Sequence, residues 1–292
     1  MPVKPILTVL LLLSAIAHAS EPLRVLCFNL RYINKGDTGD RTWTARRDQA
    51  AEVILKDKPD LIGIQEGLRP MLDDIAERVP GYVEIGGGRE DGLAKGEYTA
   101  LLVRADRFTI QQSGTFWLSD TPEAIASTTW GNQVVRICTW AKLYDRTTKR
   151  AFHFFNTHLD HQTPLARQKG TELIVSRMAA CGADGPFILT GDLNARPEDP
   201  LHGLLTTGPC GLVDVWAALH PGATPEESVT AHSFIGKPDG SRIDYIYASK
   251  AFTPVDSEVL RTNINGVYPS DHYPVRATLA FPTDQPVVAP AE

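Results

Sequence analysis

The sequence predicts one domain built from β-sheets that helices cover on their outer faces. Short apolar runs rich in Val, Ile and Phe recur along the chain and end in Gly, Pro, Asn or Asp, which is typical of strands. Stretches with helical spacing alternate with these runs, and no interior linker divides the 292 residues. The alternation indicates layers of sheet and helix, while the periodicity alone leaves α/β and α+β arrangements open.

Eight segments have the composition and length of strands. They are residues 23–31, 61–66, 99–104, 137–144, 151–158, 187–190, 243–248 and 275–280. Three stretches have the spacing of helices, namely residues 44–56, 70–79 and 164–180. The last two begin with proline, which is favoured in the first helical turn.

The two ends of the chain differ in composition from the rest. Residues 1–19 resemble a secretory signal peptide, because Lys4 precedes an apolar run that ends in Ala17-His18-Ala19. That run is too short to cross a bilayer, which takes about 20 apolar residues. We therefore expect a protein exported to the periplasm or the extracellular space, a domain over residues 20–283 and a disordered tail over residues 284–292.

The charge balance bears on the partners of the protein. Removing Lys4 with the signal peptide changes the net charge from −6 to −7. A tight, non-specific binder of nucleic acid is usually basic, so this balance disfavours nucleic acid but leaves a locally positive cleft open. No other segment is apolar enough to cross a membrane, and the sequence leaves the oligomeric state open.

The four cysteines fall into two kinds. Cys27 and Cys138 lie in apolar runs and are expected to be buried thiols. Cys181 and Cys210 lie in polar, Gly-rich stretches. In an exported protein they are either joined in a disulfide or present as two thiols, and the sequence does not choose.

Polar side chains occur at six strand ends. They are Asn29 with Arg31, Glu66, Asn156 with His158, Asp192 with Asn194, Arg242 with Asp244, and Asp271 with His272. Residues two apart in a strand point the same way, so the paired residues within a strand are expected to share a face. Each alone is typical of a turn, an ion pair or a hydrogen-bonded histidine. Together they offer the carboxylate and amide oxygens that Mg²⁺ prefers, and a histidine that an aspartate can orient.

This inventory favours metal-assisted chemistry on a phosphate. Zinc is disfavoured because Cys-x-x-Cys and His-x-x-x-His spacings are absent, and no GxSxG or GxxxxGK[ST] motif occurs. Three arginines are candidate contacts for an anionic substrate, Arg31, Arg89 and Arg136. For Arg31 and Arg136 the alternative is a structural ion pair.

Two further features bear on the predicted site. Gly86–Gly88 predicts a flexible loop beside the cleft, which would carry Arg89. Trp43, Trp117 and Trp130 either line a cleft that stacks bases or sugars, or pack in the core.

The motifs VLCFNLRY, IGIQEG, FFNTHLDH, ILTGDLN, SRIDYIY and PSDHYPV, in this order, resemble the endonuclease/exonuclease/phosphatase superfamily. Stretches such as TWTARRDQ and RICTWA resemble a bacterial exported subgroup of it. The resemblance implies a DNase I-like fold, a four-layer α/β-sandwich with two packed mixed β-sheets flanked by helices.

The resemblance also implies roles. Glu66 would be the principal Mg²⁺ ligand, helped by Asn29 and Asp271, with Mn²⁺ or Ca²⁺ as substitutes. A second group would act on the substrate. Asp192 would orient or deprotonate the attacking water, Asn194 would hold the water or the phosphate, His272 steered by Asp244 would contact the phosphate, and His158 would be a second phosphate contact.

These roles predict a metal-dependent phosphoric ester hydrolase. We expect its substrate to be a small phosphorylated metabolite, a lipid head group or a glycan phosphate, carried as a diester or a monoester. The alternative is an extracellular nuclease acting on DNA or RNA. An inactive binding module is disfavoured, because binding alone does not need the full set of catalytic positions.

Overall fold

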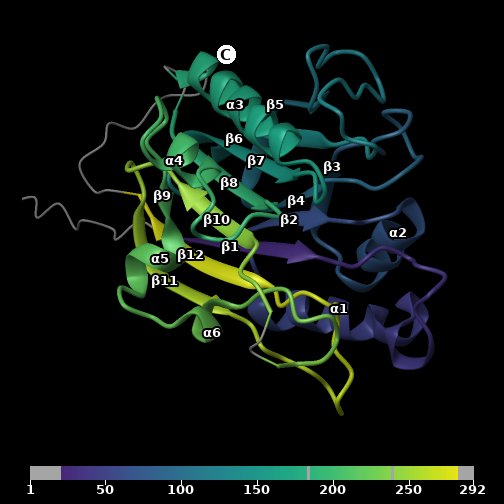
Figure 1. The fold of residues 1–292 in the computed structure, drawn as a ribbon. Coiled ribbons are helices and arrows are strands. Elements are labelled where there is room, and N and C mark those ends of the chain that lie inside the picture. The colour runs from purple at the N-terminus through teal and green to yellow at the C-terminus, as the bar shows by residue number, and fades with distance from the viewer. Residues whose placement is uncertain (1–20, 183–184, 238–239, 282–292) are drawn as a thin grey trace, which may run out of the picture.

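Two six-stranded sheets pack face to face and helices cover their outer faces in the computed structural model, which describes residues 21–182, 185–237 and 240–281 (Figure 1). This four-layer arrangement is the predicted DNase I-like sandwich. The predicted signal peptide and the predicted tail lie outside the described residues. Within those residues no helix is long and apolar enough to span a bilayer.

The first sheet has the strand order β11-β12-β1-β2-β4-β3. Its strands in chain order are β1 Leu23–Asn29, β2 Leu61–Gln65, β3 Tyr82–Ile85, β4 Leu101–Arg104, β11 Thr253–Val259 and β12 Val275–Ala280. β1 and β2 are parallel, and the other neighbours are antiparallel. The sheet is therefore mixed, and the ends of β1 and β2 lie side by side.

The second sheet has the order β5-β6-β7-β8-β10-β9. Its strands are β5 Phe108–Trp117, β6 Ile137–Asp145, β7 Arg150–His158, β8 Phe187–Asp192, β9 Val213–Asp214 and β10 Asp244–Ala248. Again one pair is parallel, β7 with β8, and the rest are antiparallel. Each sheet thus contributes one pair of strands whose carboxyl ends meet.

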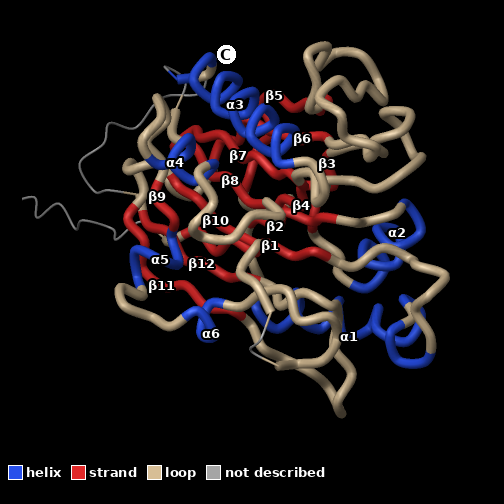
Figure 2. Tube along the Cα trace, in the orientation of Figure 1, coloured by secondary structure: helices blue, strands red, loops and turns tan. Residues whose placement is uncertain are grey.

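The helices lie over the two outer faces of the sandwich and beside its edge strands β9 and β11 (Figure 2). They are a 3₁₀ turn Gly39–Arg41, α1 Trp43–Asp57, α2 Arg69–Arg78, α3 Pro164–Ala180, α4 Leu201–Thr206, α5 Val215–Leu219 and α6 Pro225–Ser228. Side chains of α1 and α2 pack on the outer face of β1 and β2, and those of α3 and α4 pack on β7 and β8. A third apolar cluster fills the space between the sheets, as alternation along the strands requires.

The four strands that the sequence did not predict are the four sheet edges, β3, β5, β9 and β11. An edge strand has a partner strand on one side only and carries polar residues, and β5 and β11 both contain exposed residues. They therefore lack the continuous apolar run that identifies an interior strand.

Several sequence alternatives are settled by burial. Trp43, Trp117 and Trp130 are 5%, 6% and 8% exposed, so they pack in the core and line no open cleft. Cys181 and Cys210 pack against the same apolar cluster under α3 and are not joined in a disulfide.

The predicted flexible loop at Gly86–Gly88 is instead a packed turn. Its backbone is hydrogen-bonded to the returning segment, with the Gly88 N–H donating to the Leu93 carbonyl at 3.1 Å. A Cβ added at Gly87 would lie 2.3 Å from the Gly92 carbonyl oxygen, so the close approach of the two segments requires glycine there.

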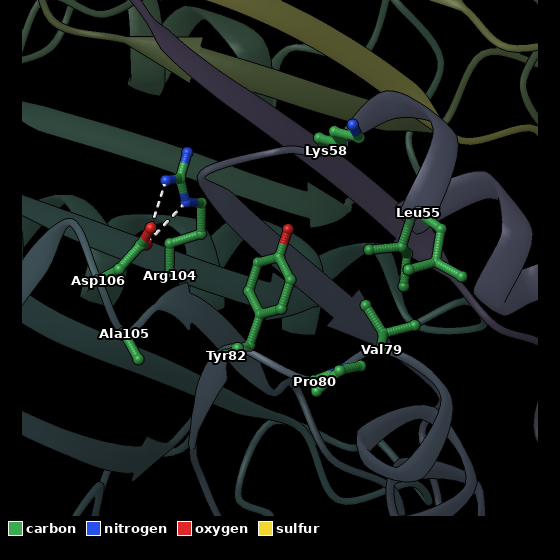
Figure 3. A pocket seen from close by; sticks show the side chains of 10 residues that line it. Leu55, Lys58, Val79, Pro80, Tyr82, Arg104, Ala105 and Asp106 are labelled. Carbon is green, nitrogen blue, oxygen red and sulfur yellow. Dashed lines mark hydrogen bonds and ion pairs between the residues drawn. The ribbon is translucent and has the colours of Figure 1, made fainter.

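A pocket of about 490 Å³ lies at the far end of the first sheet, where β2 begins and β4 ends. Figure 3 shows Tyr82 and Val79 lining it, with Arg104 paired to Asp106 at 2.7 Å. None of the predicted site residues lines this pocket.

Candidate active site

The two parallel strand pairs bring the predicted polar residues to one end of the sandwich. Asn29 at the end of β1 is in register with Gln65, which precedes Glu66, and His158 at the end of β7 is in register with Asp192. Contacts between the sheets join the two pairs, because the Asn29 amide donates to Asp192 at 3.0 Å and to Glu66 at 3.2 Å.

The strands end in turns at this point, which corrects two expected faces. Arg31, Glu66 and Asn194 have φ of 55°, 60° and 48°, in the left-handed region that few non-glycine residues adopt. Arg31 and Asn194 therefore do not continue the faces of Asn29 and Asp192. Instead the Asn194 backbone N–H donates to Asp192 at 2.9 Å, and its side chain donates to the Leu159 carbonyl at 3.0 Å.

A third face is corrected at β10. That strand begins at Asp244, so Arg242 lies before it and does not share a strand face with Asp244. Arg242 pairs with Asp214 and lies over the Trp216 ring at 4.9 Å.

Asp192 is the centre of the cluster. Its carboxylate lies 3.5 Å from His158 Nε2 and 3.9 Å from His272 Nδ1. Burial, together with the charge of Asp244, raises the pKa of Asp192 to about 7. A carboxyl group with such a pKa can take up and release a proton near neutrality.

Asp244 and His272 form a pair beside Asp192. His272 Nδ1 donates to the Asp244 carboxylate at 2.8 Å, and the Asp244 backbone N–H donates to the Thr230 hydroxyl at 3.2 Å. Burial alone would lower the pKa of His272, but the charge and hydrogen bond of Asp244 raise it well above the usual value. His272 is thus held protonated and in one orientation. Burial, with the charges of Arg136 and Arg89, lowers the pKa of His158 well below its usual value, so this ring is neutral.

The donor set fits a divalent cation. One ligand atom from each of Glu66, His158 and Asp192 lies within 4.8 Å of the others, and Asp192, Asp244 and His272 form a second such group. Burial raises the pKa of Asp271, and the nearby Glu66 adds to this. Buried carboxylates that crowd together are stabilised by a hard cation. The Asn29 side-chain oxygen accepts from the Arg31 amide at 2.8 Å, so the side chain presents its nitrogen to the acids.

Two of the three predicted arginines are engaged by carboxylates. Arg31 donates twice to Asp37, both at 3.1 Å, and lies 3.6 Å from Asp271. Arg89 donates twice to Glu97, at 2.7 and 2.8 Å. The pairs that Arg31 makes are those that its alternative interpretation, a structural ion pair, requires.

Arg136 differs from the other two. It is 4% exposed, contacts His161 at 2.9 Å and lies 3.9 Å from Asp160. Its Nη1 has no hydrogen-bond partner among the described residues. It borders a cavity of about 10 Å³ that His158 also lines, which is room for one water molecule.

Sequence reasoning noted Asn156 but gave it no role. Its side chain crosses the space between the sheets, donating to the Ile64 carbonyl at 2.7 Å and the Ala100 carbonyl at 3.1 Å. It also accepts from Gln65 at 2.6 Å. The sequence feature that accompanies this role is the glycine at position 63 in the facing strand. A Cβ added there would lie 2.7 Å from the Asn156 side-chain oxygen. Asn156 joins the two sheets directly beneath the cluster.

Comparisons with known proteins agree with this fold. Residues 26–272 match the model of the endonuclease/exonuclease/phosphatase family. The structure of a member from Bacteroides vulgatus is 30% identical, with a TM-score of 0.82, and the match covers 90% of this chain and 100% of that one. A mannosyl-6-phosphatase from Bacteroides thetaiotaomicron is 33% identical with a TM-score of 0.80, covering 89% and 100%.

More distant similarity extends to nucleic-acid enzymes. The structure of D. rerio TDP2 with a single-stranded DNA product is 19% identical with a TM-score of 0.70, covering 88% of this chain and 98% of that one, which shows a shared fold alone. The comparison with curated proteins gave no match. The family model and the two Bacteroides structures establish that the chain belongs to the endonuclease/exonuclease/phosphatase family, whose members are hydrolases of phosphoester bonds.

Proposed function

We propose that the protein is a Mg²⁺-dependent phosphoesterase that hydrolyses a small phosphorylated substrate by in-line attack of water. The observation that carries the proposal is the buried carboxyl of Asp192, which lies between the Asn29 amide, His158 and the Asp244–His272 pair. A buried acid surrounded by two histidines and further acids suits proton transfer next to a phosphate.

Each residue then has one task. Asp192 accepts the proton of the attacking water, and Asn194 holds that water or the phosphate. Protonated His272, oriented by Asp244, donates a hydrogen bond to the charge that develops on the phosphate, and His158 is a second phosphate contact. Glu66, Asn29 and Asp271 would hold Mg²⁺, which when bound supplies positive charge opposite the phosphate oxygens. To present its oxygen, Asn29 would have to turn its amide. Mn²⁺ and Ca²⁺ are the expected substitutes.

Arg136 is the arginine best placed to contact the substrate. Among the described residues its Nη1 has no hydrogen-bond partner, and its side chain lines the same small cavity as His158, whereas Arg31 and Arg89 already donate to carboxylates. We therefore assign a phosphate contact to Arg136 first. Arg31 and Arg89 remain outer contacts, each of which an anionic substrate would share with the carboxylate that the arginine already binds.

Two observations support a small substrate. The mannosyl-6-phosphatase is 33% identical over nearly the whole chain, and the net charge of −6 disfavours a polyanion. The alternative, a nuclease, has the TDP2 structure bound to DNA in its favour, but that similarity extends to the fold alone.

A substrate screen tests the proposal. Purified protein is incubated with mannose 6-phosphate, inositol phosphates, an aryl phosphodiester, sphingomyelin, plasmid DNA and RNA, with Mg²⁺ or with EDTA. We expect Mg²⁺-dependent release of product from one of the small phosphate esters and none with EDTA. If DNA or RNA is cleaved far faster than the other substrates, the protein is a nuclease instead. If EDTA leaves hydrolysis unchanged, the proposed metal dependence is wrong.

A further inference from the structure

Arg46 of α1 is a fully buried arginine whose hydrogen bonds, within the described residues, all go to backbone carbonyls. Nη1 donates to Leu30 and, at 3.0 Å, to Pro269, and Nη2 donates to Arg31. Nε donates to Arg41 at 2.9 Å. A buried guanidinium without a carboxylate partner is costly, so these four carbonyls must be held in place to satisfy it.

Three of the four carbonyls, those of Leu30, Arg31 and Pro269, belong to two segments that approach the site from opposite ends of the chain. Leu30 and Arg31 directly follow Asn29, whereas Pro269 lies two residues before Asp271. Arg46 therefore joins the loop after β1 to the loop before β12. Asn29 directly precedes the first loop and Asp271 lies in the second, and both are proposed cation ligands.

A third segment completes the arrangement. The Arg46 guanidinium lies over the Phe234 ring at 5.7 Å and over the Trp43 ring at 5.2 Å. The backbone amides of His232 and Ser233, just before Phe234, donate to the Asp271 carbonyl at 2.8 and 3.1 Å. The loop holding Asp271 is thus fixed from both sides, by Arg46 and by the segment stacked on Arg46.

The charge of Arg46 persists at neutral pH. Burial lowers its pKa to about 10, and the nearby acids Asp271, Asp37 and Glu66 oppose that shift. The cation stays close to the acids without contacting any of them.

We propose that Arg46 is a positioning residue for the metal site: by holding the Leu30–Arg31 and Pro269 carbonyls together, it sets the separation of Asn29 and Asp271. In this role Arg46 acts through the two loops and would contact neither substrate nor metal. The inference rests on the proposed function, because it takes Asn29, Glu66 and Asp271 as the cation ligands.

The test measures Mg²⁺ affinity of the substrate-free protein by calorimetry and by the Mg²⁺-induced rise in melting temperature. Arg46→Met removes the guanidinium, and Arg46→Lys keeps a charge that is too compact to reach both loops. We expect either variant to bind Mg²⁺ about 10–100-fold more weakly, the scale seen when the groups that orient metal ligands are removed. Faster amide exchange is expected in both loops, residues 30–37 and 267–271.

Arg107→Lys is the control at a buried arginine far from the site, although Arg107 also pairs with Asp60 and Asp145, each at 2.9 Å. Arg107 is 3% exposed and also donates to carbonyls, those of Pro22 at 3.1 Å and Glu21 at 2.9 Å, but at the opposite end of β1 from Asn29. We expect it to lower the melting temperature and leave Mg²⁺ affinity within about twofold, below the range expected at Arg46.

The outcomes separate the two claims. Wild-type protein that binds no Mg²⁺ or other divalent cation would overturn the proposed cofactor, and the inference with it. If the wild type binds Mg²⁺, an unchanged affinity in a folded Arg46 variant overturns the inference alone, as does an equal loss in Arg107→Lys. Should Arg46→Met fail to fold, Arg46→Lys decides.

Discussion

At the scale of single residues, Asp192 is the side chain on which the proposed chemistry depends. Its replacement by Asn keeps the shape but removes the proton acceptor, so we expect kcat to fall by about 10²-fold or more, the scale of one general acid–base contribution. The measurement is steady-state hydrolysis of the best substrate from the screen, with circular dichroism to verify the fold. Asp73→Asn, at an exposed position on α2, is the control and should keep full activity. A folded Asp192→Asn protein with near-normal turnover would refute the assignment.

The Asp244–His272 pair predicts a specific dependence on pH. In the wild type Asp244 holds the pKa of His272 well above its usual value, so the ring stays protonated below that raised pKa and loses its proton as pH rises through it. Replacing Asp244 by Asn leaves burial to dominate and lowers the pKa. We expect the alkaline limb of kcat/KM to move to lower pH in Asp244→Asn. An unchanged limb would mean that His272 does not act in its protonated form.

The residues differ in how far the sequence could predict them. Glu66, Asp192, Asp244 and His272 lie at or beside the ends of interior strands, so a pattern of polar residues bordering apolar runs was enough to find them. Arg46 and Asn156 bind backbone carbonyls of segments far away in the chain. A backbone carbonyl has no sequence signature, so only the folded chain identifies such a partner.

At the scale of elements, the eight interior strands were predictable and the four edge strands were not. Interior strands bury both faces and show as apolar runs, whereas the edge strand β11 has exposed Thr253, Asp256 and Glu258. Strand ends were less predictable than strand existence. The turns at Glu66 and Asn194 have left-handed backbone conformations, which the residue types at these positions were not enough to predict.

The contact between the two sheets can be tested at Asn156. Replacing Asn156 by Ala removes one donor from each of the Ile64 and Ala100 carbonyls and one acceptor from Gln65, in a fully buried place. The Ala100 carbonyl keeps the Ile64 backbone N–H at 2.8 Å, and Gln65 keeps the Gly63 carbonyl at 3.2 Å. Each such group costs about 1–3 kcal/mol, and we expect the free energy of unfolding to fall by about 3 kcal/mol after partial relaxation. Urea denaturation measures this loss. The control Asn263→Ala, in an exposed loop, should cost about 1 kcal/mol or less. Equal losses in the two variants would show that Asn156 does not link the sheets energetically.

At the scale of the whole molecule, the fold explains why the site forms where it does. Each sheet contains a single parallel strand pair, and packing the sheets face to face sets the two pairs of carboxyl ends together. The antiparallel strands β10 and β12 enter from the other direction, so Asp244 and His272 come from the start of a strand or the segment before one. The sequence order of the motifs therefore says little about their positions in the site.

The expected export of the protein is tested on the whole chain. Since residues 1–19 have the pattern of a signal peptide, we propose that the secreted form begins near Ser20. N-terminal sequencing of the protein recovered from the periplasm or the medium measures this. Exported protein that still carries Met1 would be inconsistent with cleavage.

The central claim is that water attacks phosphorus. It is tested most directly by hydrolysing the best substrate in water labelled with heavy oxygen and locating the label by mass spectrometry. We predict that the label enters the phosphate product and is absent from the released alcohol. Label in the alcohol would show cleavage of the carbon–oxygen bond and would contradict the account.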